Sequence, residues 1–416
     1  MNTSVSEKAR ISSSEEINAF LEYGYLPESE ISISPNILWA ARQEEVTENL
    51  VKHGVTALKS AFASAVKETP INALHVLPLS GGLDSRTILA ALLEHVDPSR
   101  IQTVTFGIPG TYDFELGQRV ASRAGVNSRV IDLNEFDWSE QELLSCAKKC
   151  KRPTLIFERA INAYAWDQFS GDNVVYWSGY MGDPLAGGHL PVTPIDTWEK
   201  SLERFALNNR AVASNLTSNE FDPLSVLPKE PLDEGLEFVE QLDFGVRQPC
   251  YIKPTVINPG AQTPFLREEW VSFILRVPRR QRVRRRLYKD IVTAAYPNLF
   301  SIPTEASQGL KITAPRWQVE ATRYAEAIKR RVLKVVGIRS LRRTTNYLDF
   351  EVALRKEMKP LIIQQLRDLK DRGIVEWIDV GDIWKKHLAG KDLTDEIHVL
   401  VSLEFFLKAQ DATSSY

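Results

Sequence analysis

Ser80-Gly81-Gly82-Leu83-Asp84-Ser85 stands between an apolar run at 74–79 and a segment at 87–93 whose apolar residues have helical spacing. This order predicts a strand, a glycine turn and a helix. Two glycines let the backbone turn tightly and let a ligand approach it closely. The first N–H groups of the helix and the hydroxyls of Ser80 and Ser85 offer hydrogen-bond donors to an anion. The turn is therefore expected to bind a phosphate group.

Asp84 is a carboxylate within a turn that otherwise suits an anion. A magnesium ion between the two would reconcile them, because Mg²⁺ is commonly held by one or two carboxylates together with phosphate oxygens. The turn is not a Walker loop, since no Gly-Lys-Ser or Gly-Lys-Thr follows it. The alternative interpretation is a surface turn with a helix cap, for which Ser and Asp are also common residues.

The composition is that of a globular protein with 416 residues, 43% of them hydrophobic and 25% charged. A net charge of −3 argues against a nucleic-acid partner for the whole molecule. Cys146, Cys150 and Cys250 are accompanied by no His or Cys cluster, so neither a disulfide framework nor a cysteine metal site is expected, and the cytoplasm is the expected location. No run of 18 apolar residues predicts a membrane span.

Strands and helices alternate between residues 71 and 134, which is typical of a parallel α/β unit. Ligands of such sheets bind at the carboxyl ends of the strands. The loops that begin at Ser80, Gly107 and Ser178 each follow a predicted strand, so we expect them to converge on one crevice. The predicted strands lie at 74–79, 101–106, 129–133 and 173–177, and helices are expected at 87–93, 114–124, 316–336, 347–373 and 398–408.

The loop at 80–85 resembles the PP-loop of the N-type ATP pyrophosphatases, and its residue sequence is similar to that of the asparagine synthetase group. In this family ATP is cleaved to AMP and pyrophosphate while a carboxylate is activated as an acyl-adenylate. The resemblance covers roughly residues 20–410. It implies an open, mostly parallel, five-stranded type of sheet with helices on both faces, followed by a largely helical C-terminal part. It implies ATP and Mg²⁺ as cofactors, and it implies that Asp84 binds the metal. The residues that it implies at the nucleotide are Leu79, Ser80, Gly81, Gly82, Asp84 and Ser85.

The same resemblance divides the chain into four parts. Residues 1–60 are expected to form a helical lead-in, and residues 61–190 to form the ATP-binding α/β core. Residues 191–235, which are rich in Pro, Asn, Asp and Ser, are interpreted as an insertion or cover. Residues 236–416 are expected to form the helical remainder of the synthetase domain.

The loop from Phe106 to Asp113 resembles the one after the family's second strand, with the same Gly-x-Pro-Gly-x-x-Asp spacing. The resemblance implies that Phe106 and Gly107 lie at the adenine, where Phe106 packs near the purine. Without the loop at 80–85 beside it, this segment would be interpreted as an ordinary turn between a strand and a helix.

Ser178-Gly179-Tyr180-Met181-Gly182-Asp183 is similar to the family's Ser-Gly-Glu-Gly-Ala-Asp. The resemblance implies that Ser178 and Gly179 meet the ribose and phosphate of AMP and that Asp183 is the second carboxylate on Mg²⁺. Two carboxylates that share a dication avoid the cost of burying an unpaired charge. The alternative is a glycine-rich turn without a ligand.

Tyr180 stands where asparagine synthetases carry Glu. In this respect the chain resembles the β-lactam synthetases, in which a tyrosine with a carboxylate partner acts as the base on the attacking amine. A free tyrosine has a pKa near 10, so it needs such a partner to accept a proton at neutral pH. Asp243 falls roughly where the family places that carboxylate, with a surface charge on a helix as the alternative.

A cation is needed near the negative charge that develops on the transferred phosphate. The family's catalytic lysine is expected in the loop at 302–311, but Glu305 takes its aligned position and Lys311 is the nearest lysine. Lys311, or one of the six arginines at 279–286, is therefore the candidate. A run of charges is more often a solvated helix face, and the second basic cluster, from Lys329 to Arg343, is interpreted in that way.

The leading hypothesis is an ATP- and Mg²⁺-dependent ligase that forms an amide bond between a small carboxylate substrate and ammonia or an amine. Asparagine synthetases carry a glutaminase cysteine directly after the first Met, where this chain has Asn2, so the nitrogen is expected from solution, from a separate glutaminase or from the substrate itself. An intramolecular cyclase of the β-lactam or lasso-peptide type is one alternative. A nucleotide-binding subunit without catalysis, favoured by Glu305 and Met181, is another.

Overall fold

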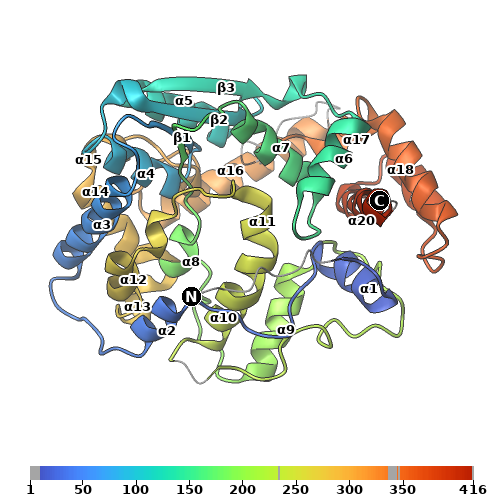
Figure 1. Ribbon diagram of the computed structural model, residues 1–416, viewed down its shortest axis with the longest axis horizontal. Helices are drawn as coiled ribbons and strands as arrows, with labels where there is room; N and C mark the ends of the chain where they lie inside the picture. Colours follow the sequence, from blue (N-terminus) through green and yellow to red (C-terminus); the bar gives the residue numbers. More distant parts are fainter. Residues whose placement is uncertain (1–9, 233–234, 336–343, 345–346, 415–416) are drawn as a thin grey trace.

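The computed structural model describes residues 10–232, 235–335, 344 and 347–414, and it shows a parallel sheet beside a large helical part (Figure 1). The predicted open parallel α/β sheet is confirmed. Its four strands follow the order β3-β2-β1-β4, and all pairs are parallel. Gln262 adds one parallel bridge to Trp177 beyond the end of β4, at the edge where a fifth strand would lie. The strands are β1 (Leu74–Pro78), β2 (Ile101–Gly107), β3 (Asn127–Asp132) and β4 (Val174–Tyr176).

The two faces of the sheet pack against two separate hydrophobic cores. Successive side chains of a strand point to opposite faces, so Val76 of β1 lies in one core and Leu77 lies in the other. Helices cover both faces, as expected for a parallel sheet. The core around Leu77 is built with α3 (Leu50–Lys67), α4 (Asp84–Leu92), α5 (Tyr112–Ala124), α12 (Glu268–Ile274) and α14 (Arg286–Ala295), and the core around Val76 with α6 (Glu140–Lys149), α7 (Ile156–Asp167), α18 (Lys359–Asp371) and α20 (Thr394–Ser414).

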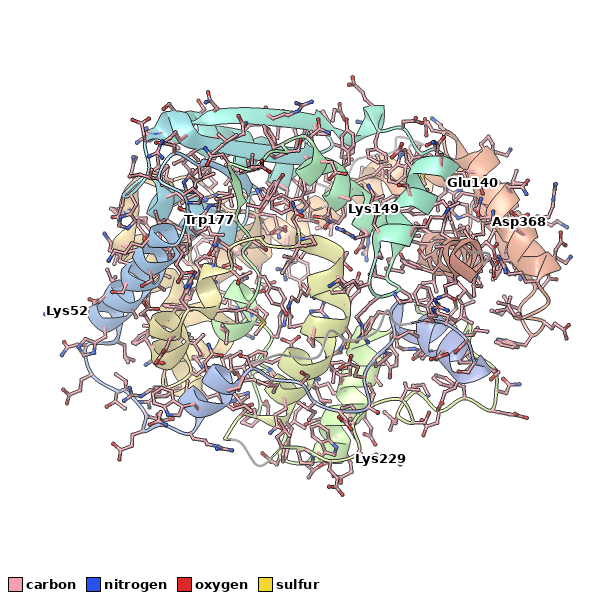
Figure 2. The ribbon with its side chains drawn as sticks, viewed as in Figure 1. Lys52, Glu140, Lys149, Trp177, Lys229 and Asp368 are labelled. Atoms are coloured by element: carbon pink, nitrogen blue, oxygen red, sulfur yellow. The ribbon has the colours of Figure 1, made fainter. Side chains whose placement is uncertain are left out.

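The helical part is tied to the rest by charged side chains as well as by its core. Lys408 of α20 lies 2.7 Å from Glu140 Oε1 and 2.6 Å from Asp368 Oδ2, so one ammonium joins three helices. Figure 2 shows Glu140 and Asp368 on neighbouring helices at this end of the molecule. Among the described residues, no helix is long and apolar enough to cross a bilayer.

The segment after residue 235 contains a rare element. The short helix α10 (Phe238–Leu242) continues into a π-helix, η3 (Asp243–Ile252), and then into α11 (Lys253–Val256). Pro249 lies inside η3 and supplies no backbone N–H. π-helical segments occur frequently at functional sites, and η3 supplies residues to the site described below.

The predicted helix at 347–373 is divided in two. Helix α17 (Phe350–Arg355) ends before Pro360, and α18 begins at Lys359, because proline suits the first turn of a helix but not its interior. Helix α16 (Arg316–Val335) is close to its predicted length. The remaining elements are α1 (Ser14–Tyr23), α2 (Pro35–Ala41), η1 (Pro98–Arg100), η2 (Leu133–Glu135), α8 (Gly182–Leu185), α9 (Trp198–Asn209), η4 (Pro264–Leu266), α13 (Arg279–Arg282), η5 (Val283–Arg285), α15 (Pro297–Phe300), η6 (Glu305–Ser307) and α19 (Val380–Leu388).

Candidate functional site

The loop after β1 is fixed by hydrogen bonds that use its own hydroxyls. Ser85 Oγ accepts the Ser80 N–H at 3.2 Å, and Ser80 Oγ accepts the Gly82 N–H at 3.1 Å. The Gly81 N–H donates to Asp113 Oδ1 at 3.0 Å. The loop therefore meets the N-terminus of α4, which begins at Asp84, in a compact turn. A phosphate oxygen could take the place of the side-chain oxygens that these amides now meet.

Glycines bring Asp84 and Asp183 together from two different loops. A Cβ at Gly179 would lie 2.9 Å from Asp84 Cβ, and a Cβ at Gly182 would lie 2.6 Å from Asp84 Cγ. At Gly188 a Cβ would collide with the Asp183 carboxylate. Burial, followed by the negative charge of Asp183, raises the pKa of Asp84 from 3.8 to about 7. The two carboxylates are therefore close enough to repel each other.

Two side chains from the segment before and within α14 contact this acidic pair. The Tyr288 hydroxyl, which is fully buried, donates to Asp84 Oδ1 at 2.9 Å. Arg285 Nε lies 3.1 Å from Asp183 Oδ1. Arg284 and Arg285 both have left-handed backbone angles, with φ values of 62° and 58°, which is uncommon for residues other than glycine. This turn directs Arg285 to the carboxylates.

The six arginines at 279–286 divide between two environments. Arg280, Arg284 and Arg286 are exposed, as expected for a solvated face. The other three meet acids: Arg282 Nη1 lies 2.8 Å from Glu240 Oε1, Arg279 pairs with Glu237, and Arg285 pairs with Asp183. One cation of the run therefore lies beside the candidate metal ligands.

The loop that carries Asp183 keeps an unusual backbone at Met181. Met181 has a φ of 66°, a left-handed conformation that suits glycine and that costs other residues roughly 1 kcal/mol or more. Glycine occupies this position in the motif that the loop resembles. The turn thus retains the shape of that motif although the residue has changed. It also keeps Ser178 Oγ in position to accept the Tyr180 N–H at 3.3 Å.

A histidine joins the acidic pair to Asp243. His189 Nδ1 lies 2.7 Å from Asp243 Oδ2, and His189 Nε2 lies 3.6 Å from Asp183 Oδ2. Burial lowers the pKa of His189, but the hydrogen bond to Asp243 and the charges of Asp243 and Asp183 outweigh it, so the pKa is raised overall. Gln248 Nε2 donates to Asp243 Oδ1 at 3.1 Å across the wide turn of η3, and Arg247 Nη1 lies 3.8 Å from the same atom.

Tyr180 lies near His189 and Asp243, but the Asp243 carboxylate forms its hydrogen bonds with His189 and Gln248. Burial, followed by the charge of Asp243, raises the pKa of Tyr180 above its usual value. A phenol with a raised pKa keeps its own proton at neutral pH, so it cannot readily accept another. The geometry thus offers His189 as a second candidate for a base, which the sequence analysis did not identify.

Three cavities meet around these residues. The largest, of about 410 Å³, is lined by Asp84, Ser178, Gly179, Tyr180 and Asp183, and also by Trp177. Figure 2 shows Trp177 in the interior of the molecule, where its Nε1–H donates to His75 Nδ1 at 3.0 Å. A second cavity, of about 240 Å³, is lined by Leu79, Ser80, Phe106, Gly107 and Asp113. A third, of about 270 Å³, adjoins the first at His189 and Arg247 and includes Asp243.

Tyr347 separates the first cavity from the second and lines both. Its ring stacks on Phe106, with 6.0 Å between ring centroids and 4° between ring planes. The Asn162 side chain donates to the Tyr347 hydroxyl at 3.2 Å. The wall beside Phe106 is therefore built from two stacked aromatic rings.

The loop with Glu305 is docked directly on the glycine loop. The Glu305 N–H donates to the Gly81 carbonyl at 3.0 Å. Burial and the charge of Asp113 raise the pKa of Glu305. Arg86, which is fully buried, holds the preceding turn by donating to the carbonyls of residues 302 and 303 at 2.7 and 2.8 Å. Lys311 is exposed and does not line the three cavities.

The structure brings together most of the residues singled out from the sequence. The glycine loop, the strand end at Phe106 and Gly107, and the segment from Ser178 to Asp183 surround adjoining cavities. Asp243 is linked to Asp183 through His189, whereas Lys311 lies away from these residues. His189 has only a weak signal in the sequence, its position directly after Gly187-Gly188, and Tyr288 and Tyr347 have no local signal.

No curated protein matches the chain. The sequence model of the asparagine synthase family matches residues 57–236, which include the loop at 80–85 and the loop at 178–183. This segment is therefore similar to the synthetase domain of that family, and no glutaminase domain is matched.

Proposed function

We propose that this protein uses ATP to activate a substrate carboxylate as an acyl-adenylate and then passes the acyl group to ammonia or an amine. The observation that supports this most is the close approach of Asp84 and Asp183 beside the glycine loop. Two like charges held close together in a partly buried site are unfavourable unless a cation joins them. A magnesium ion carried by the phosphates of ATP would meet that need.

The donor set fits Mg²⁺ on phosphate better than a metal bound by protein alone. Among the described residues, no three or more His, Cys, Asp and Glu side chains are grouped so that they could hold a metal ion. Mg²⁺ is usually held by one or two carboxylates together with phosphates and water, and Asp84 and Asp183 supply those two carboxylates. When bound, Mg²⁺ would offset the negative charge that builds on the phosphates during adenylation.

The first half-reaction would take place along the glycine loop. A substrate carboxylate attacks the α-phosphorus, and pyrophosphate leaves. We assign the binding of pyrophosphate to the loop amides and to the hydroxyls of Ser80 and Ser85, in place of the oxygens that occupy those amides here. Arg285, beside Asp183, is the cation best placed to stabilise the leaving charge. Ser178 and Gly179 would hold the AMP half.

The second half-reaction needs a group that accepts a proton from the attacking nitrogen. Tyr180 with Asp243 is the pair proposed from the sequence. His189 is the other candidate, because it lines the 410 Å³ cavity while its Nδ1 is held by Asp243 at 2.7 Å. Asp243 would orient the imidazole and favour its protonated form, as a carboxylate does for a catalytic histidine elsewhere.

Pyrophosphate release in the presence of ATP, Mg²⁺ and a panel of small carboxylic acids tests the proposal. We expect at least one acid to stimulate release and expect the Asp183→Asn variant to abolish it. Calorimetric titration with ATP and Mg²⁺ is the companion measurement. Binding of ATP without release of pyrophosphate for any acid would favour a nucleotide-binding subunit without catalysis, and absence of ATP binding would reject both.

Product mass separates the two enzymatic alternatives. Conversion of an acid to its primary amide leaves the mass nearly unchanged, whereas ring closure within one substrate removes one water. The second result would identify an intramolecular cyclase, for which a substrate amine replaces ammonia.

A further inference from the structure

Helix α16 (Arg316–Val335) presents a row of large apolar side chains to solvent. Trp317 is 69% exposed, Tyr324 69%, Ile328 61% and Val332 57%. They are seven, four and four residues apart, so they fall on one face of the helix over about four turns. The other exposed large apolar side chains among the described residues are scattered over many elements. We call this row the α16 stripe. Figure 1 shows α16 as one long helix that crosses behind the centre of the molecule.

The orientation of α16 is the reverse of that usual in a globular protein. A surface helix normally turns its apolar side to the core and its charged side to water. Here Val319, Thr322 and Glu326, on the opposite side from the stripe, are only partly exposed, whereas the stripe is open to solvent. Large contiguous apolar surfaces of this kind mark sites of interaction with proteins or membranes.

Positive charge surrounds the stripe. Arg316, Arg323, Lys329 and Arg331 are all exposed. Of the two acids on the helix, Glu320 is neutralised by Arg316 at 3.7 Å and by Arg323 at 3.5 Å. The other, Glu326, lies on the inward side. The face that carries the stripe therefore combines apolar surface with a net positive charge.

This combination matches an anionic lipid surface. Long Arg and Lys side chains can lie along the helix and extend their charges to headgroup phosphates, and the polar tips of Trp and Tyr suit the boundary between headgroups and acyl chains. A second copy of the chain would place two positive helices side by side. A groove on a partner protein would be expected to form directional hydrogen bonds with the helix. The stripe instead offers apolar atoms, with long charged side chains beside it.

We propose that α16 binds reversibly to the surface of membranes that contain anionic lipids, with the α16 stripe turned into the headgroup region. A basic amphipathic helix with aromatic residues on its apolar side binds in this way, parallel to the bilayer plane. The inference stands apart from the proposed ligase activity, since it uses no residue of that site.

Vesicle flotation of the full-length protein tests the proposal. With vesicles of phosphatidylcholine and phosphatidylglycerol at low salt, we expect bound protein to exceed that with phosphatidylcholine alone by about tenfold, and we expect salt to weaken binding because it screens the charges. Tyr324→Glu and Ile328→Glu should each abolish flotation, and the double variant Lys329→Glu/Arg331→Glu should remove the preference for the anionic lipid.

Leu207→Glu is the matched control, because Leu207 is an apolar side chain of another helix with 70% exposure. It should float as the native protein does. Since all these positions are exposed, thermal unfolding should be unchanged in every variant. Absence of flotation with anionic vesicles would overturn the proposal. Sedimentation of the native protein as a dimer that Ile328→Glu dissociates would overturn it too, because the stripe would then be a protein interface.

Discussion

Glu240 and Asp84 both lie near the arginine segment at 279–286, but their charges are balanced in different ways. Glu240 is paired with Arg282 at 2.8 Å, and both side chains are almost inaccessible to solvent. Asp84 instead faces a second carboxylate, Asp183, and its pKa is raised to about 7. The first arrangement balances its charge within the chain. The second brings two carboxylates together, and we propose that a magnesium ion completes this arrangement.

We propose that this difference separates charges that hold the fold from charges that meet a ligand. The acidic pair is compensated by the Tyr288 hydroxyl on Asp84 and by Arg285 and His189 beside Asp183. Removing an acid from the Glu240 pair should therefore affect stability, and removing one from the Asp84 pair should affect activity.

The largest effect is expected from Asp183→Asn. The variant loses one of the two carboxylates proposed for Mg²⁺, so pyrophosphate release should fall on the order of 1,000-fold, comparable to removal of a key electrostatic group from an active site. Its fold should persist, because a like-charge repulsion is removed. Activity and urea unfolding of the same preparation provide the measurement. Near-native activity would show that Asp183 holds no metal.

Glu240→Gln is the reciprocal change. It leaves the Arg282 guanidinium buried without its partner, and breaking a buried ion pair in this way costs about 3 kcal/mol of unfolding free energy. Urea unfolding should show that loss, while the affinity for ATP with Mg²⁺ should change little. The double variant Glu240→Gln/Arg282→Met is the control, since it removes both charges and should regain part of the stability. A native midpoint for Glu240→Gln would mean that the pair contributes nothing.

The sequence predicted the parts of the site that are local in the chain. The loop at 80–85 and the loop at 178–183 each follow a strand, and parallel strands present their carboxyl ends at one edge of the sheet. Convergence of Asp84 and Asp183 could therefore be expected from strand order. The match of residues 57–236 to the asparagine synthase family was predicted from the same short motifs, and the parallel α/β sheet from the alternation of strands and helices at 71–134.

The contacts between distant segments could not be predicted in this way. His189 meets Asp243, the first residue of the π-helix η3, across 54 positions of sequence. Tyr288 reaches Asp84 across 204 positions of sequence. The arginine run includes two left-handed residues, Arg284 and Arg285, which single-sequence patterns do not reveal.

The raised pKa of Asp84 makes stability depend on pH. The folded state binds the proton of the Asp84 carboxyl more tightly than the unfolded state does. The free energy of unfolding should therefore fall as pH rises from about 4 to about 7, by roughly 2 kcal/mol after allowance for solvent screening. Asp84→Asn should lack this decline and be more stable than the native protein above about pH 7. Unfolding at several pH values without Mg²⁺ provides the measurement. Parallel curves for the two proteins would contradict the acidic-pair interpretation, and added Mg²⁺ should narrow the difference.

The smallest effect should come from Lys311→Ala, which tests whether the missing cation of the family is replaced by Lys311 or by Arg285. Lys311 is exposed and lies outside the three cavities, whereas Arg285 contacts Asp183. Pyrophosphate release should therefore fall less than about threefold in Lys311→Ala, since isolated surface charges contribute little. Arg285→Ala should lower it by about 100-fold, as loss of a charge at the reacting phosphate does. A larger loss of activity in Lys311→Ala than in Arg285→Ala would mean that the loop at 302–311 closes on bound ATP and brings Lys311 to the phosphates. Lys311, and not Arg285, would then be the cation that stabilises the leaving charge.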